Sequence, residues 1–407
     1  MLLNQAWSLL LVSVGAAFLP SLSRVIRLPA IVLEILFGVI LGRSVLHLEF
    51  TGDWLSFLAQ LGFLLLMFQA GMEIDFAMLR KQSARQLVLQ LAIFFSTFGL
   101  ALIASFAFGY GIFVALILTT TSLGLVVPTL RETGLTKSVL GQSILLAATL
   151  ADFLTLVGIT FYALWYEHGP HWQFLAPIPL FLGFGLILKL LKLWAWWHPQ
   201  AAGRLLSSQD SQEMGVRLSL ALLFLFVALS ELAGLEPVLG AFMGGAVLAV
   251  IFREKGHLET KLSGIGYGFL VPFFFIHVGM QFNLANVLSP DQLLFTLKLL
   301  VAAVIVKILP GFLLSFGGIP FHQVFKAGIL LSSRLSLIIV AASIGLDLGF
   351  IDAPMKDDVV LLAVVTCLFG PSAFKWLHRP EESSEDETGK DWTGDGSVGW
   401  IRRNGEP

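Results

Sequence analysis

Long apolar segments alternate with short polar ones along nearly the whole chain. Each segment is near the ~20 residues that an α-helix needs to cross ~30 Å of hydrocarbon. The segments are continuous and rich in Leu, Phe, Ala and Gly, whereas a membrane β-barrel needs alternating polarity. The pattern therefore predicts an all-α polytopic membrane protein of about 13 spans. They cover approximately residues 6–22, 28–46, 54–70, 87–106, 111–130, 139–166, 174–196, 215–233, 237–251, 265–280, 293–313, 324–346 and 359–376.

Composition agrees with this pattern and removes several classes of protein. Of the 407 residues, 57% are hydrophobic and 13% are charged, and the mean hydropathy is +0.86. A soluble domain carries about a quarter charged residues, so a cytoplasmic enzyme and a secreted module are both excluded. The sequence contains no phosphate-binding loop, no H-E-x-x-H motif and no G-x-S-x-G elbow. We therefore expect no enzyme, no resident cofactor and no nucleic-acid partner.

Basic residues concentrate in the loops that follow odd-numbered spans. By the positive-inside rule these loops are cytoplasmic, which places the amino end outside and the carboxyl end inside. Residues 380–407 are acidic, Gly-rich and almost without aliphatic side chains, so we predict a disordered cytoplasmic tail after a transmembrane domain of residues 1–379. The basic residues counted are Arg24, Arg27, Arg80, Lys81, Arg85, Arg131, Lys137, Arg204, Arg217, Arg253, Lys255, Lys261, Lys375 and Arg379.

The two halves of the chain repeat each other. Pro29 corresponds to Pro237, and the Gly71-Met72 pair corresponds to Gly279-Met280, each 208 residues further along. This offset moves the second and third spans onto the ninth and tenth. Seven spans is an odd number, so the two copies, residues 28–166 and 235–376, would have opposite orientations in the membrane. Inverted repeats are typical of secondary transporters, whose sites lie at the midplane on interrupted helices.

Matching interruptions occur in the two halves. The fifth span contains TTTSLGLVVP from Thr119 to Pro128, and the twelfth contains LLSSRLSLIIV from Leu330 to Val340. Both place hydroxyls and small residues in the middle of an apolar helix, where unwinding is tolerated if the freed groups line a cavity. Bonding of these hydroxyls to the backbone of an intact helix is the alternative. We predict two broken crossing helices.

Asp152 is the most deeply placed acidic residue, near the middle of the sixth span. A charge at the bilayer centre costs ~2.5–3.5 kcal/mol and usually marks an ion pathway. We interpret Asp152 as a carboxylate that binds a metal cation and a proton in turn, which is sufficient for exchange. Hard cations prefer oxygen ligands, and Thr120, Thr121 and Ser122 could complete the shell. A structural ion pair of Asp152 with a buried base is the alternative.

Two basic residues lie at similar depth. An always-charged guanidinium cannot relay protons, so Arg334 is expected to balance the charge of the site or of helix ends. Lys307 could do the same, or could deprotonate during the cycle. Glu34 would either pair with a helix amino terminus or line a vestibule. Ala151, directly before Asp152, is counted with the ion-binding residues. The residues that could line the site are Thr149, Ser332, Ser333, Ser336 and Glu34.

Several segments together resemble the monovalent cation/proton antiporter superfamily, particularly its Kef-type and Nha-type branches. AATLAD resembles the ion-site helix of that family, whose final Asp, here Asp152, is the carrier. Lys307 and Arg334 also match family positions. The other matching segments are LEILFGVILG from Leu33, FQAGMEID from Phe68, LGAFMGGAVLA from Leu239 and FFFIHVGMQFN from Phe273. The resemblance implies a Nha-type fold, exchange of Na+ or K+ for H+, and a homodimer in a bacterial plasma membrane.

Two departures from the family pattern bear on mechanism. The residue before the carrier Asp is Asp, Asn or Gln in family members, yet here it is Ala151. The Arg-Gly-Glu of the family is here Arg334-Leu335-Ser336. A single titratable carboxylate suggests one proton per cation, hence electroneutral exchange. Kef-type members often carry a nucleotide-binding regulatory domain, which we do not expect in this chain.

Two other functions remain open from the sequence. One is a sodium-coupled organic solute symporter of related inverted-repeat fold, which would need a second, roomier apolar pocket beside the cation site. The other is a non-transporting membrane sensor or partner subunit, which the two departures make conceivable.

Overall fold

The computed structural model describes residues 2–378 apart from residues 4, 27, 51–52, 74–82, most of 169–212, 234, 252–255 and 285–288. The predicted seventh span falls mostly within these gaps, and the predicted tail lies outside the described residues. The helices of the first half are α1 (Gln5–Ile26), α2 (Ala30–Leu41), α3 (Trp54–Met72), α5 (Ala84–Ala107), α6 (Ile112–Thr119), α7 (Leu123–Glu132) and α8 (Val139–His168). Those of the second half are α11 (Met214–Leu232), α12 (Pro237–Ile251), α13 (Gly256–Ile265), a π-turn η2 (Gly266–Leu270), α14 (Val271–Gln281), α16 (Pro290–Gly311), a 3-10 turn η3 (Phe312–Gly317), α17 (Phe321–Leu331), α18 (Ser336–Asp347) and α19 (Ala353–Leu377).

The prediction of a helical multi-span protein is confirmed. Within the described residues, nine helices are long and apolar enough to cross a membrane, and the bent pair α17–α18 makes up to ten. The predicted second and ninth spans correspond to α2 and α12, which are apolar but shorter than expected, at 12 and 15 residues. α2 is short because it lies between Pro29 and Gly42, neither of which has helical backbone. Beyond helices, the described residues hold one short parallel pairing, β1 (Leu2–Leu3) with β2 (Glu49–Phe50).

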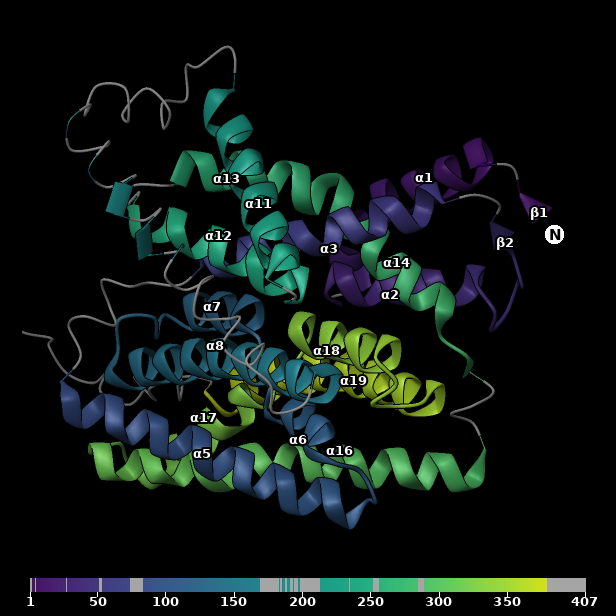
Figure 1. Ribbon diagram of the computed structural model, residues 1–407. Coiled ribbons are helices and arrows are strands. Elements are labelled where there is room, and N and C mark those ends of the chain that lie inside the picture. The colour runs from purple at the N-terminus through teal and green to yellow at the C-terminus, as the bar shows by residue number, and fades with distance from the viewer. Residues whose placement is uncertain are drawn as a thin grey trace, which may run out of the picture.

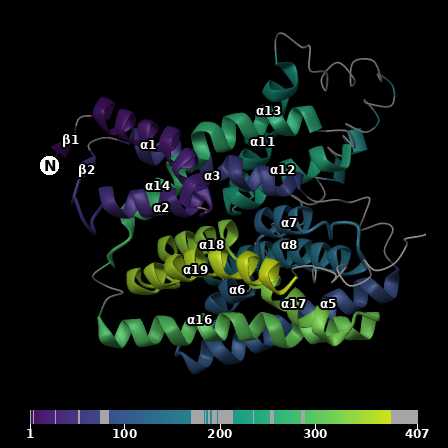
Figure 2. The ribbon, with the colours of Figure 1, turned by 180° about the vertical axis from the view of Figure 1, so that it is seen from behind.

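The described helices form two layers, which Figure 1 and the reverse view in Figure 2 both show. One layer, here called the α3 bundle, contains α1–α3 and α11–α14. The other, the α8 bundle, contains α5–α8 and α16–α19. Helices within each layer pack against one another, as α12 does on α3 and α18 on α19. The chain enters each layer twice, once from each half, as the predicted repeat requires.

Two glycine-mediated helix contacts in the α3 bundle are copies of each other. Where α2 meets α14, a Cβ on Gly38 would lie 2.1 Å from the Ile276 carbonyl oxygen, and one on Gly279 would lie 2.0 Å from that of Ile35. Where α12 meets α3, the same relation joins Gly245 to the Phe68 oxygen at 1.9 Å, and Gly71 to the Phe242 oxygen at 2.0 Å. Glycine is needed at all four positions because no side chain fits between the backbones. The sequence repeat is therefore also a repeat of contacts.

Candidate functional site

Both predicted helix interruptions are present, and they meet inside the α8 bundle. α6 ends at Thr119, the chain is extended at Thr120 and Ser122, and α7 then begins. In the second half α17 ends at Leu331 and α18 begins at Ser336, with a bend of 46° between them. Consecutive β-branched threonines weaken the helix at the first break. Each break leaves backbone N–H and C=O groups without helical partners in the interior of the protein.

Asp152 faces the amino end of α7. Its Oδ2 accepts a hydrogen bond from the Leu123 backbone N–H at 3.3 Å. This is a favourable position for an anion, because the exposed N–H groups and the helix dipole both carry positive charge there. Its Oδ1 is buried and has no hydrogen-bond partner in the described structure. One oxygen of the carboxylate is therefore held in place while the other is available to a ligand.

Arg334 comes from the second break but binds the first one. The side chain is fully buried, and its Nη2 donates to the Leu118 carbonyl at 2.7 Å and to the Ala303 carbonyl at 2.8 Å. Its Nε donates to the Thr120 carbonyl at 3.2 Å, and its Nη1 donates to the Ser332 carbonyl at 3.5 Å. Backbone oxygens thus replace the water that a buried guanidinium loses. The positive charge also lies at the carboxyl end of α6, where the helix dipole is negative.

Lys307, from α16, binds the same break. Its Nζ donates to the Thr119 carbonyl and to Thr121 Oγ1, both at 2.6 Å. Among the described residues neither Lys307 nor Arg334 lies at ion-pair distance from Asp152. The alternative of a direct structural ion pair is therefore not what the structure contains. The two bases instead neutralise the carboxyl end of α6, and Asp152 binds the amino end of α7.

The remaining predicted site residues lie at different places. Thr120 and Thr149 donate their hydroxyls to backbone carbonyls, of Ile117 at 2.7 Å and of Leu145 at 2.8 Å. Ser122 and Ala151 are buried beside the first break. Glu34 is buried on α2, in the α3 bundle, and its Oε2 has no hydrogen-bond partner within the described part of the chain.

The predicted residues of the second break are brought to the same region of the α8 bundle. Ser332 donates to the Ile329 carbonyl at 2.6 Å. Ser333 Oγ is buried with no partner among the described residues, and Ser336 opens α18.

Sequence reasoning missed several groups that the fold brings to this region. The carbonyls of Leu118, Thr119 and Ala303 bind the two bases, and no side-chain pattern marks a backbone oxygen. Thr155 was missed as well, although it lies one helical turn after Asp152 on α8. That spacing was the one signal that could have indicated it.

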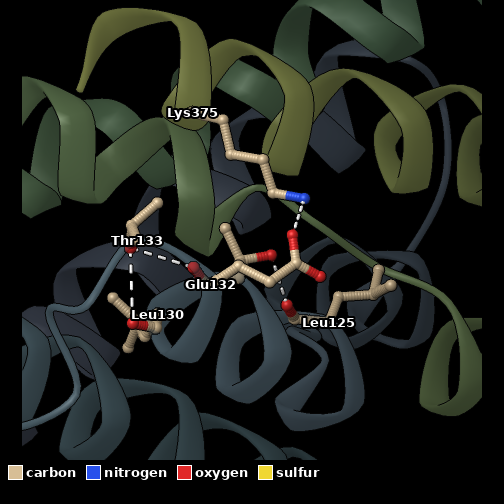
Figure 3. A network of polar contacts seen from close by, with 6 residues as sticks. Leu125, Leu130, Glu132, Thr133 and Lys375 are labelled. Carbon is tan, nitrogen blue, oxygen red and sulfur yellow. Dashed lines mark hydrogen bonds and ion pairs between the residues drawn. The ribbon is translucent and has the colours of Figure 1, made fainter. Parts of the chain in front are cut away.

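The far end of α7 is attached to α19, as Figure 3 shows. Glu132, the last residue of α7, forms an ion pair with Lys375 near the end of α19. Three residues before it, Thr129 donates to the Leu125 carbonyl at 2.7 Å, and the next residue after it, Thr133, donates to the Thr129 carbonyl at 2.9 Å. α7 is thus held at its amino end by a residue of the first half and at its carboxyl end by a residue of the second.

Comparison with known proteins identifies the family. The family profile described as "Sodium/hydrogen exchanger, transmembrane" matches residues 10–379. The chain belongs to the sodium/hydrogen exchanger family. It is therefore a multi-pass membrane transporter, classed with the cation/proton antiporters, and not an enzyme, as its sequence predicts.

Individual relatives show the same resemblance over most of the chain. It is 34% identical to "Putative Na(+)/H(+) antiporter YjbQ" of Bacillus subtilis, over 93% of this chain and 64% of that protein. This chain thus spans 64% of that relative's length. It is 28% identical to "Probable Na(+)/H(+) antiporter 3" of Methanocaldococcus jannaschii, over 88% of this chain and 92% of that protein.

The fold is that of a solved antiporter. The structure of the sodium proton antiporter MjNhaP1 from Methanocaldococcus jannaschii matches with a TM-score of 0.66, over 92% of this chain and 97% of that one. The two sequences are only 13% identical, so this likeness concerns the fold alone. It confirms the predicted Nha-type architecture.

Proposed function

We propose that this exchanger moves one Na+ or K+ against one H+, and that both ions use Asp152 in turn. The observation that carries the proposal is the state of the Asp152 carboxylate. One oxygen is fixed at the amino end of α7, and the other is buried with no partner in the described structure. A carboxylate held this way is poised to bind either a proton or a cation, and binding one excludes the other.

The proposed stoichiometry follows from the surroundings of this carboxylate. Ala151 supplies no second acid beside Asp152, and Lys307 hydrogen-bonds two uncharged oxygens and forms no ion pair with an acidic side chain among the described residues. The loaded site then carries the same charge with either ion. A carrier that moved a net charge would gain or lose ~2.3 kcal/mol per charge for each 100 mV of membrane potential. The rate of an electroneutral carrier would not respond to the potential.

The two bundles provide a basis for alternating access. The α8 bundle carries both breaks, and the α3 bundle is joined within itself by the glycine contacts described above. We propose that the α8 bundle moves against the α3 bundle to expose Asp152 to either side, as inverted-repeat carriers do. The proposed setting is a homodimer in a bacterial plasma membrane, with the amino end outside and the carboxyl end in the cytoplasm.

The proposed domain limits follow the repeat. The transport domain would span residues 1–379, with repeats at 28–166 and 235–376 and an acidic tail from residue 380.

The test is proton exchange by purified protein in liposomes that contain a pH-sensitive dye. A gradient of Na+ or K+ should change the internal pH, at a rate that an imposed membrane potential leaves unchanged. Asp152→Asn should abolish the response, because a neutral amide cannot take up and release a proton and has no negative charge to exchange for that of a cation. Asp53→Asn is the matched control, since Asp53 is an exposed acid at the start of α3 and should be dispensable.

Three outcomes would contradict the proposal. Exchange that survives Asp152→Asn would remove Asp152 as the carrier. A rate that follows the potential would contradict the one-for-one stoichiometry. Uptake of an organic anion in a Na+ gradient, without cation/proton exchange, would favour the symporter.

A further inference from the structure

Thr155 differs from the other threonines of α8. A helical threonine usually donates its hydroxyl to the carbonyl four residues earlier. Thr149 and Thr160 do so, to the Leu145 carbonyl at 2.8 Å and the Leu156 carbonyl at 3.0 Å. Thr155 is equally inside the protein, with 0% exposure, yet its Oγ1 makes no hydrogen bond in the described structure. Its hydroxyl has therefore turned away from the backbone without gaining a partner.

A buried hydroxyl without a partner is unfavourable, so it is uncommon unless something else occupies the space it faces. The second such oxygen on α8 is Asp152 Oδ1. Positions three apart on a helix are neighbours, with Cβ atoms about 5–6 Å from each other. Two unsatisfied oxygens thus lie one turn apart on the same helix, next to the first break.

Several other hydroxyls near Asp152 already make hydrogen bonds within the protein. Thr120 donates to the Ile117 carbonyl, and Thr121 Oγ1 accepts from Lys307. Thr149 donates to the backbone of its own helix. Among the threonines of α8 and the first break, Thr155 is the one whose Oγ1 makes no hydrogen bond in the described structure.

We propose that Thr155 is a ligand of the transported cation, completing a site with Asp152. The inference rests on the proposed function and adds to it a residue that contributes to cation affinity. A carboxylate oxygen and a hydroxyl oxygen suit a hard cation such as Na+ or K+. In this proposal Thr155 contacts the cation when the site is loaded and takes no part in protonation of Asp152. Loss of its oxygen should therefore weaken cation binding and leave protonation of Asp152 unchanged.

The deciding variant is Thr155→Val, which keeps the shape of the side chain and removes its oxygen. The half-saturating concentrations of Na+ and K+ should rise roughly tenfold, the effect of about 1.4 kcal/mol, while the maximal rate is kept. Thr155→Ser, which restores a hydroxyl, should return the half-saturating concentration toward that of the unmodified protein. Thr160→Val is the matched control, because it removes a buried threonine oxygen from the same helix and should leave the cation dependence unchanged.

A second measurement does not depend on transport. Na+ or K+ should raise the thermal unfolding midpoint of the detergent-purified protein relative to choline, because a ligand that binds the folded state stabilises it. Thr155→Val should lose most of this increase, and Thr160→Val should retain it. If Thr155→Val folds poorly, Thr155→Ala provides the same comparison.

Unchanged cation dependence and an unchanged cation-induced increase in Thr155→Val would overturn the assignment, and the hydroxyl would then face water or packing only. Failure of the proposed function would give a different result. The Asp152→Asn protein would then still exchange ions, whatever the Thr155 variants do.

Discussion

The two helix breaks hold equivalent places in the two halves of the chain and differ in chemistry. In the first, residues 120–122 separate α6 from α7, and in the second, residues 332–335 separate α17 from α18. The first break has Asp152 at the amino end of α7 and two buried bases at the carboxyl end of α6. The second break meets a glycine of α19, since a Cβ on Gly370 would lie 2.0 Å from Ser333 Oγ.

This difference separates what the repeat provides from what the side chains provide. Duplication and inversion yield two interrupted helices that meet inside one bundle, each with exposed backbone dipoles. α8 packs against α7, and α19 packs against α18, so these two helices hold equivalent places beside the breaks. The first break has a carboxylate there and the second has close packing. The geometry of the site is therefore shared between the halves, and its ion chemistry belongs mainly to one of them.

The strongest disruption of this arrangement should come from Arg334→Ala. The guanidinium joins the two breaks through the carbonyls of Leu118, Thr120 and Ser332, and it also binds that of Ala303 in α16, all buried with it. Each unsatisfied carbonyl costs ~1–3 kcal/mol, so the free energy of unfolding should fall by at least about 3 kcal/mol. The thermal unfolding midpoint in detergent measures the loss.

Arg334→Lys serves as the control for charge alone. An ammonium cannot reproduce the planar fork, so it should recover only part of the lost stability. A lysine variant as stable as the unmodified protein would show that the charge matters and the carbonyl contacts do not.

An intermediate effect is expected for Gly370→Ala, which tests whether the second break depends on packing. The added methyl would overlap Ser333 Oγ, and overpacking of this kind typically costs ~1–3 kcal/mol. Ser333→Ala alone should be close to neutral, because it removes a buried hydroxyl that makes no hydrogen bond in the described structure. The double variant should regain much of the stability that Gly370→Ala loses. Additive effects of the two substitutions in thermal unfolding would contradict a direct contact.

The smallest effect should come from Lys375→Met, which releases the far end of α7 from α19. The ion pair with Glu132 is partly exposed, with 43% and 60% of the two side chains accessible. Such a pair contributes at most about 1 kcal/mol, and salt weakens it further. At low salt the unfolding midpoint of the Lys375→Met protein should therefore lie below that of the unmodified protein. At high salt the two midpoints should be the same. A large loss that salt does not change would indicate that the pair fixes the position of α7.

Much of the fold could be predicted from the sequence because it follows from local chemistry. Apolar runs of membrane-spanning length require helices, since lipid satisfies no backbone hydrogen bonds. The shared 208-residue offset of Pro29 with Pro237 and Gly71 with Gly279 indicated the inverted repeat. Hydroxyl-rich interruptions within two apolar runs indicated where the helices break, and the depth of Asp152 singled it out. Each of these signals is contained in a short stretch of sequence.

Only the tertiary structure decided which oxygens are engaged and which are free. Lys307 and Arg334 could have paired with Asp152, yet they bind carbonyls of α6, because helix packing brings that carboxyl end within their reach. Whether a threonine donates to its own backbone or, as Thr155 does among the described residues, leaves its oxygen without a partner depends on neighbours from distant helices. The periodicity of a sequence places side chains on a helix, but it does not specify what lies opposite them. Ligand sets of this kind are therefore a property of the assembled fold.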